Sequence, residues 1–121
     1  MAAVTRQHVD VAVGARLFSS LGDPTRLAIL LSLQGGERRV GEIVDIVGST
    51  QSNVSNHLAC LKGCGLVVDR PGERRQVFYS IAHHEVQGLL AAADRLLAAT
   101  GERVALCDAP TMTALRGDSD G

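Results

Sequence analysis

Aromatic residues are nearly absent from this 121-residue sequence, which has one tyrosine, two phenylalanines and no tryptophan. A core must therefore be built from Leu, Val, Ile and Ala, which suits the close packing of helices. Hydrophobic residues make up 45% of the chain, which is too many for a disordered protein. No apolar run approaches the roughly 20 residues of a membrane helix, and the N-terminus does not resemble a secretory signal. We therefore expect one small cytoplasmic domain.

Signatures of catalysis are also missing. The sequence contains no nucleophile elbow, no phosphate-binding loop and no HExxH segment. It has only three cysteines, and an odd number argues for metal binding or thiol chemistry rather than for a disulfide framework. We therefore expect a binding protein and not an enzyme.

An excess of basic residues, the usual sign of a nucleic-acid-binding protein, is missing as well, because the net charge is −1. The charge is nevertheless unevenly distributed. Residues 1–48 are neutral, residues 49–81 carry a net charge of +2, and residues 82–121 carry −3. The middle of the chain is thus the segment suited to contact an acidic partner, and a dimer would present it twice.

Apolar residues at helical spacing predict four helices in the first half of the chain. The first ends at Gly22, and the second begins with Asp23 as its N-cap and Pro24 in its first position. The third ends at Gly48, and the fourth begins after Thr50, which can cap it. The buried side of this fourth helix is predicted to hold Val54, Leu58 and Leu61.

A change from helical to alternating periodicity follows the fourth helix. Residues 66–70 and 76–81 predict a β-hairpin, with Arg74 and Arg75 near its tip. A last helix is expected to start near His83 and to end at Gly101. Residues 108–121 are expected to form a disordered tail beyond a domain of residues 1–107.

This order of elements, four helices, a hairpin and a helix, is the plan of a winged helix-turn-helix, a mainly α fold with a β-hairpin. In such folds the second helix of the helix-turn-helix enters the major groove of DNA. Five uncharged polar residues occupy its N-terminal half here: Gln51, Ser52, Asn53, Ser55 and Asn56. Amides and hydroxyls can read base edges, although such residues can also simply solvate a helix face.

The remaining polar features each allow two interpretations. Arg74 and Arg75 fit a wing that contacts phosphates, or a solvated hairpin tip. His57 lies at the edge of the apolar face, where a hydrogen-bonded structural histidine is favoured over a base contact. The segment 83–85, His-His-Glu, is favoured as a polar helix start over a metal site.

Cys60 and Cys64 lie one helical turn apart, so both thiols point to one side of the fourth helix. Cys107 lies far downstream. A third thiolate would complete a trigonal sulfur site for a soft, large cation. The alternative is that these cysteines act as small hydrophobic residues, and their spacing alone does not decide between the two.

Two segments resemble the ArsR/SmtB family of metal-responsive winged-helix repressors. They are Leu-Gly-Asp-Pro-Thr-Arg-Leu-Ala-Ile-Leu at residues 21–30 and Gln-Ser-Asn-Val-Ser-Asn-His-Leu-Ala-Cys-Leu-Lys-Gly-Cys-Gly-Leu-Val at residues 51–67. The hairpin segment 75–79 is similar to the wing of that family. The resemblance runs from about residue 10 to residue 107 and implies a DNA-binding homodimer.

Within the family, the cysteine pattern resembles that of members that sense cadmium and lead. The resemblance implies that Cys60, Cys64 and Cys107 are the metal ligands, the first two from one subunit and the third from its partner. The family's Cys-x-Cys arsenic box is absent from the third helix, and Leu96 and Leu97 stand where a zinc site of the last helix would need ligands.

Together these features predict a homodimeric repressor that binds a palindromic operator without metal and leaves it when Cd(II) or Pb(II) binds. Dimerisation is expected through the first and last helices, where the alanines at 91–93 permit close approach. Three alternatives remain: a thiol redox switch on the same fold, an As(III) sensor, and a winged-helix module that contacts protein instead of DNA.

Overall fold

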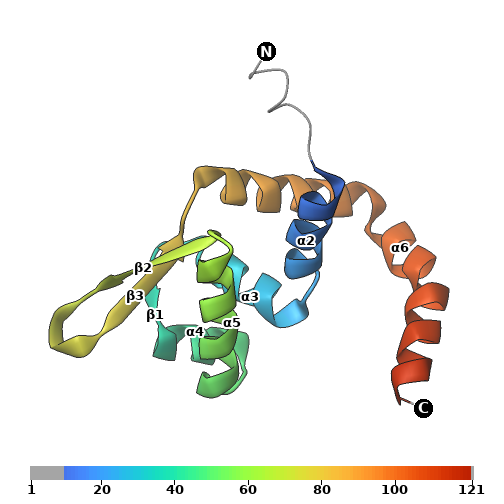
Figure 1. Ribbon diagram of the computed structural model, residues 1–121. Coiled ribbons are helices and arrows are strands. Elements are labelled where there is room, and N and C mark those ends of the chain that lie inside the picture. Colours follow the sequence, from blue (N-terminus) through green and yellow to red (C-terminus); the bar gives the residue numbers. More distant parts are fainter. Residues whose placement is uncertain (1–9, 121) are drawn as a thin grey trace. The chain divides into compact units, whose positions relative to one another are not determined.

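The computed structural model describes residues 10–120, with side chains for residues 10–104. Its elements are α2 (Val11–Leu21), α3 (Pro24–Ser32), β1 (Arg38–Arg39), α4 (Val40–Val47), α5 (Gln51–Gly63), β2 (Val67–Pro71), the 3-10 turn η1 (Glu73–Arg75), β3 (Val77–Ile81) and α6 (His84–Asp120) (Figure 1). The chain divides into two compact units after Val86, and α6 supplies the second unit from Gln87 onward. The predicted winged helix-turn-helix is therefore confirmed within the first unit.

The boundaries of α3 to α5 follow local rules that are visible in the sequence. The Asp23 carboxylate caps α3 by accepting a hydrogen bond from the Arg26 amide at 3.0 Å, as predicted. Gly48 ends α4 in the left-handed conformation, with a φ of 77° that suits glycine. The Thr50 hydroxyl then caps α5 by accepting from the Asn53 amide at 3.1 Å.

Helices α3, α4 and α5 pack pairwise and enclose the core of the first unit. Eight apolar side chains are almost completely buried there: Ile29, Leu30, Leu33, Ile43, Val54, Leu58, Leu61 and Val67. The predicted inner side of α5 is thereby confirmed, since three of the eight come from it. Each such side chain contributes roughly 1.5–3 kcal/mol through burial, so the orientation of α5 is strongly fixed.

The sheet has three antiparallel strands in the order β1-β3-β2. The hairpin of β2 and β3 was predicted, although β2 extends one residue further, so that Pro71 pairs with Val77. The two-residue strand β1 was not predicted. It pairs Arg38 with Tyr79 and Arg39 with Phe78, and so joins the middle of β3 to the start of α4.

Helix α6 begins at His84, close to the predicted start, but the predicted end at Gly101 is wrong. The helix continues through this glycine, whose cost of about 1 kcal/mol relative to alanine is too small to stop a helix by itself. Helix α6 includes the backbone of residues 108–120. That residues 108–121 form a disordered tail outside the domain stays a prediction. Over the residues described, no helix has the length and apolar character needed to cross a membrane.

Candidate functional site

The helix-turn-helix is formed by α4, the turn of residues 48–50, and α5. One hydrogen bond ties the turn to α4, and another ties it to α5. The Gly48 amide donates to the Val44 carbonyl at 2.8 Å, and the Asn53 side-chain amide donates to the Ser49 hydroxyl at 2.8 Å. These contacts fix the direction in which α5 leaves the turn.

The N-terminal half of α5 presents an uncharged polar face to solvent. Four of the five predicted base-reading residues are exposed on it: Gln51, Ser52, Ser55 and Asn56. The fifth, Asn53, is half-buried, and its amide nitrogen is engaged by Ser49. Because the opposite side of α5 is buried in the core, the exposed face has a fixed orientation.

The hairpin of β2, η1 and β3, called the wing below, carries Arg74 and Arg75 in the turn at its tip, as predicted (Figure 1). Both side chains are exposed, and the described part of the chain places neither of them in an ion pair. Both backbones adopt positive φ angles, 60° and 65°, which arginine rarely adopts. The loop is closed by the Gly72 amide, which donates to the Gln76 carbonyl at 2.7 Å.

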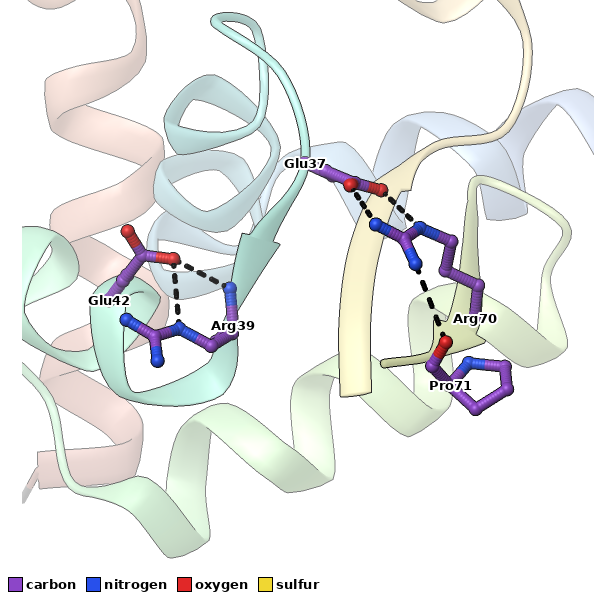
Figure 2. A network of polar contacts seen from close by, with 5 residues as sticks. All are labelled: Glu37, Arg39, Glu42, Arg70 and Pro71. Carbon is purple, nitrogen blue, oxygen red and sulfur yellow. Dashed lines mark hydrogen bonds and ion pairs between the residues drawn. The ribbon is translucent and has the colours of Figure 1, made fainter. Parts of the chain in front are cut away.

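The other two basic residues of the segment 49–81 are neutralised by carboxylates. Lys62 pairs with Asp69 at 3.0 Å. Arg70 makes a forked contact with Glu37, with 2.9 Å between Nε and Oε2 and a second contact from Nη2 to Oε1 (Figure 2). Among the residues with described side chains, Arg74 and Arg75 therefore carry the unpaired positive charge of the wing.

The pair of Glu37 and Arg70 was not singled out from the sequence. The hydrogen bond from Arg70 lowers the pKa of the Glu37 carboxyl, and the same bond raises the pKa of the guanidinium. A second carboxylate nearby, Glu42, accepts a 3.0 Å hydrogen bond from the Arg39 amide at the start of α4 (Figure 2). That bond lowers the pKa of Glu42 and caps the helix.

His57 is a structural residue, as the sequence favoured. It is half-buried on α5, and its Nδ1 accepts a hydrogen bond from Arg26 Nε on α3 at 3.1 Å. The ring is thus tied to the neighbouring helix and does not belong to the exposed face.

Cys60 and Cys64 lie at the C-terminal end of α5, where the Cys64 amide donates to the Cys60 carbonyl at 3.0 Å. Both thiols are free, and Cys60 is half-buried whereas Cys64 is exposed. The side chain of Cys107 lies outside the described residues. Across the part of the structure with described side chains, no group of three or more His, Cys, Asp or Glu residues could hold a metal ion.

A hollow of about 330 Å³ adjoins Cys64. It is lined by residues of α2 and of the segment that follows α5: Val13, Arg16, Leu17, Ser20, Cys64 and Leu66. The three other polar candidates, His83, His84 and Glu85, are exposed at the start of α6, where His84 Nε2 lies 3.4 Å from Glu85 Oε2. They form a polar helix start, as the sequence favoured.

Known bacterial regulators are similar in sequence to this chain. Residues 23–68 match the model of the bacterial regulatory protein family arsR. A probable mercury resistance operon repressor from Streptomyces lividans is 41% identical over 92 residues, which cover 76% of this chain and 70% of that protein. The chain belongs to the ArsR family. The family and this relative are regulators, in agreement with the prediction that the chain is not an enzyme.

Two further relatives are informative. The transcriptional regulator CmtR of Mycobacterium tuberculosis is 53% identical over 68 residues, which cover 56% of this chain and only 57% of CmtR. An NMR structure described as the cadmium metal-sensor CmtR matches with a TM-score of 0.56, at 47% identity over 64% of this chain and 80% of that one. The crystal structure of M. tuberculosis Rv0081 matches with a TM-score of 0.71, at 35% identity over 78% of this chain and 95% of that one.

Proposed function

We propose that this ArsR-family chain is a homodimeric repressor that binds operator DNA without metal and releases it when Cd(II) or Pb(II) binds Cys60, Cys64 and Cys107. One observation carries the proposal. The exposed polar face and the cysteine pair lie on the same helix, α5, the face in its N-terminal half and the pair at its C-terminal end. A ligand at the cysteines would therefore act directly on the helix that reads DNA.

The exposed face supports the DNA-binding part. Gln51, Ser52, Ser55 and Asn56 offer amide and hydroxyl groups that can pair with base edges in a major groove. Asn53 belongs to the same proposed surface. Its side-chain nitrogen donates to Ser49, so its side-chain oxygen is the atom that would accept a hydrogen bond from a base. Arg74 and Arg75 would contact phosphates beside it.

The thiol donors support the proposed class of metal. Two thiols one turn apart suit a soft cation, and they are an incomplete set among the described side chains. A third thiolate from Cys107 of the partner subunit would complete it, and the open hollow beside Cys64 leaves room for an approaching segment. A cadmium metal-sensor and a mercury resistance repressor among the relatives point to the same class of cation.

Exposed apolar side chains support the dimer. On α2, Val11 and Phe18 are 83% and 62% exposed, and on α6, Leu96 is 62% exposed and Leu97 is 50% exposed. Large apolar residues left in solvent on two helices are typical of surfaces that a partner covers. A second copy of the chain would bury both, as the sequence predicted for the first and last helices.

The regulation follows from linkage. If metal binding ties α5 to the partner's tail in an arrangement that only the DNA-free dimer adopts, metal weakens DNA binding. DNA must then weaken metal binding by the same factor.

The decisive experiment uses two mutant subunits of the dimer. One carries Cys60→Ser and Cys64→Ser, and the other carries Cys107→Ser. A heterodimer of the two retains one complete site if the ligands come from both subunits, and it then binds one Cd(II), seen as thiolate-to-metal absorption, although neither mutant homodimer does. Failure of the heterodimer to recover a tight site would reject the site shared between subunits. A wild-type protein that keeps its DNA in the presence of bound Cd(II) and Pb(II) would reject the proposed regulation.

A further inference from the structure

One aromatic ring connects the ion pair of Glu37 and Arg70 to the loop at the tip of the wing. The Arg70 guanidinium lies 4.7 Å above the centre of the Phe78 ring, a cation–π contact between paired residues of β2 and β3. The ring also lies against Gly72, so closely that a side chain at this position would collide with it. Gly72 is the residue that opens the loop of Arg74 and Arg75.

The loop needs such support, because two successive arginines in it adopt positive φ angles. Conformations of this kind persist where the surrounding structure holds them. Among the described residues, two backbone hydrogen bonds close the loop at its base, from the Gly72 amide to Gln76 and from the Gln76 amide to Glu73. The packing of Phe78 against Gly72 is a further contact that ties this loop to the rest of the wing.

We propose that Glu37 and Arg70 position the wing for DNA. Glu37, which precedes β1, binds the Arg70 guanidinium (Figure 2). It thereby holds the guanidinium over the Phe78 ring, and the ring in turn holds the loop at Gly72. Arg74 and Arg75 are thereby kept in the orientation in which they meet phosphates. This inference rests on the proposed DNA-binding function and assigns positioning roles to Glu37 and Arg70 within it.

Two simpler roles for the pair fit the structure less well. The pair is exposed, with 39% of the Glu37 side chain and 55% of the Arg70 side chain accessible, and exposed ion pairs add little to stability. Arg70 is also poorly suited to contact phosphate itself, because its Nε and one terminal nitrogen already donate to Glu37. A forked contact fixes orientation, which is what a positioning pair requires.

The test measures binding of a random-sequence 30-base-pair duplex as a function of salt, since phosphate contacts do not depend on sequence. Four variants are compared with the wild-type protein: Glu37→Gln, Arg70→Gln, the double variant, and Asp45→Asn. Asp45 is an exposed carboxylate on α4, so its variant controls for the loss of one negative charge. A second readout is hydrogen exchange at the Gly72 and Gln76 amides.

If the pair positions the wing, Glu37→Gln weakens binding several-fold although it removes a negative charge, and Asp45→Asn does not. The slope of log affinity against log salt falls in magnitude by about 1 to 2, as expected for the loss of one or two phosphate contacts. Arg70→Gln and the double variant show the same loss as Glu37→Gln, and all three exchange the two amides faster.

The opposite results are equally distinct. Tighter binding by Glu37→Gln, with a steeper salt slope, would mean that Arg70 is released to contact phosphate itself, and this would overturn the proposal. Unchanged amide exchange in Glu37→Gln would also overturn it. If the wild-type dimer does not bind the duplex at all, the proposed DNA-binding function fails, while amide exchange still tests whether the pair holds the loop.

Discussion

Arg26 Nε donates a 3.1 Å hydrogen bond to His57 Nδ1 and so connects the first turn of α3 to the middle of α5. Arg26 also supplies the backbone amide that Asp23 caps at the start of α3. The orientation of α5 about its own axis is therefore set by a polar contact as well as by its buried apolar side.

Replacing His57 is expected to change stability and not base discrimination. His57→Ala removes a half-buried hydrogen bond, whose net contribution is about 0.5–1.5 kcal/mol, and leaves the exposed face of α5 in place. Urea unfolding of His57→Ala, Arg26→Gln and the double variant should show losses that do not add, as for one shared contact. Asn56→Ala removes an exposed side chain from the same helix and is the matched control for stability, which it should leave unchanged. A His57→Ala protein of normal stability that no longer distinguishes operator from random DNA would show that the ring reads a base.

The polar face and the wing arginines are expected to differ in what they contribute to DNA binding. Ser55→Ala or Asn56→Ala should reduce discrimination between operator and random DNA, by roughly 1–3 kcal/mol where a bidentate contact to a base is lost. Arg74→Ala or Arg75→Ala should weaken binding to both duplexes alike and flatten the salt dependence. Binding titrations at several salt concentrations separate the two effects. Equal losses on both duplexes for the α5 variants would argue against base reading.

Zinc is expected to release DNA poorly compared with Cd(II) or Pb(II). The proposed site offers three thiolates, a set that suits a large, soft cation. The family resemblance further implies that a zinc site on the last helix would need ligands where Leu96 and Leu97 stand. Titration of the DNA complex with each metal, followed by anisotropy, checks this expectation. A zinc response that survives replacement of all three cysteines would contradict it and would direct attention to residues 83–85.

Acid is expected to destabilise the fold through three carboxylates. Hydrogen bonds from the Arg26 amide, the Arg70 side chain and the Arg39 amide lower the pKa of Asp23, Glu37 and Glu42, respectively. A lowered folded-state pKa adds stability that is complete above the unfolded value of about 4 and is lost as the pH falls through the folded value. Urea unfolding between pH 6 and pH 3 measures the loss.

Asp23→Asn offers a matched variant for this pH dependence, because asparagine caps a helix about as well as aspartate but does not titrate. Its stability should fall less steeply than that of the wild-type protein below about pH 4. An identical pH profile for the two proteins would show that Asp23 does not contribute to acid sensitivity.

Local signals in the sequence determined most of the fold. The capping residues Asp23 and Thr50 and the stop at Gly48 set helix boundaries that the structure reproduces, because a cap involves groups only a few residues apart. The apolar spacing of α5 likewise predicted its buried side, and hence its exposed one. The placement of Cys60 and Cys64 on one side of α5 was predicted for the same reason, since residues one turn apart on a helix lie on the same side.

Only the tertiary structure decided the contacts between distant segments. Glu37 and Arg70 lie 33 positions apart, and no periodicity of either segment predicts that their side chains meet. The strand β1 escaped prediction because two arginines have no strand pattern of their own and are extended by pairing with Phe78 and Tyr79. The end of α6 was also misjudged at Gly101, because glycine weakens a helix without forcing it to end. Local chemistry thus specified the elements and the candidate face, whereas pairing across the sheet determined how the wing is held.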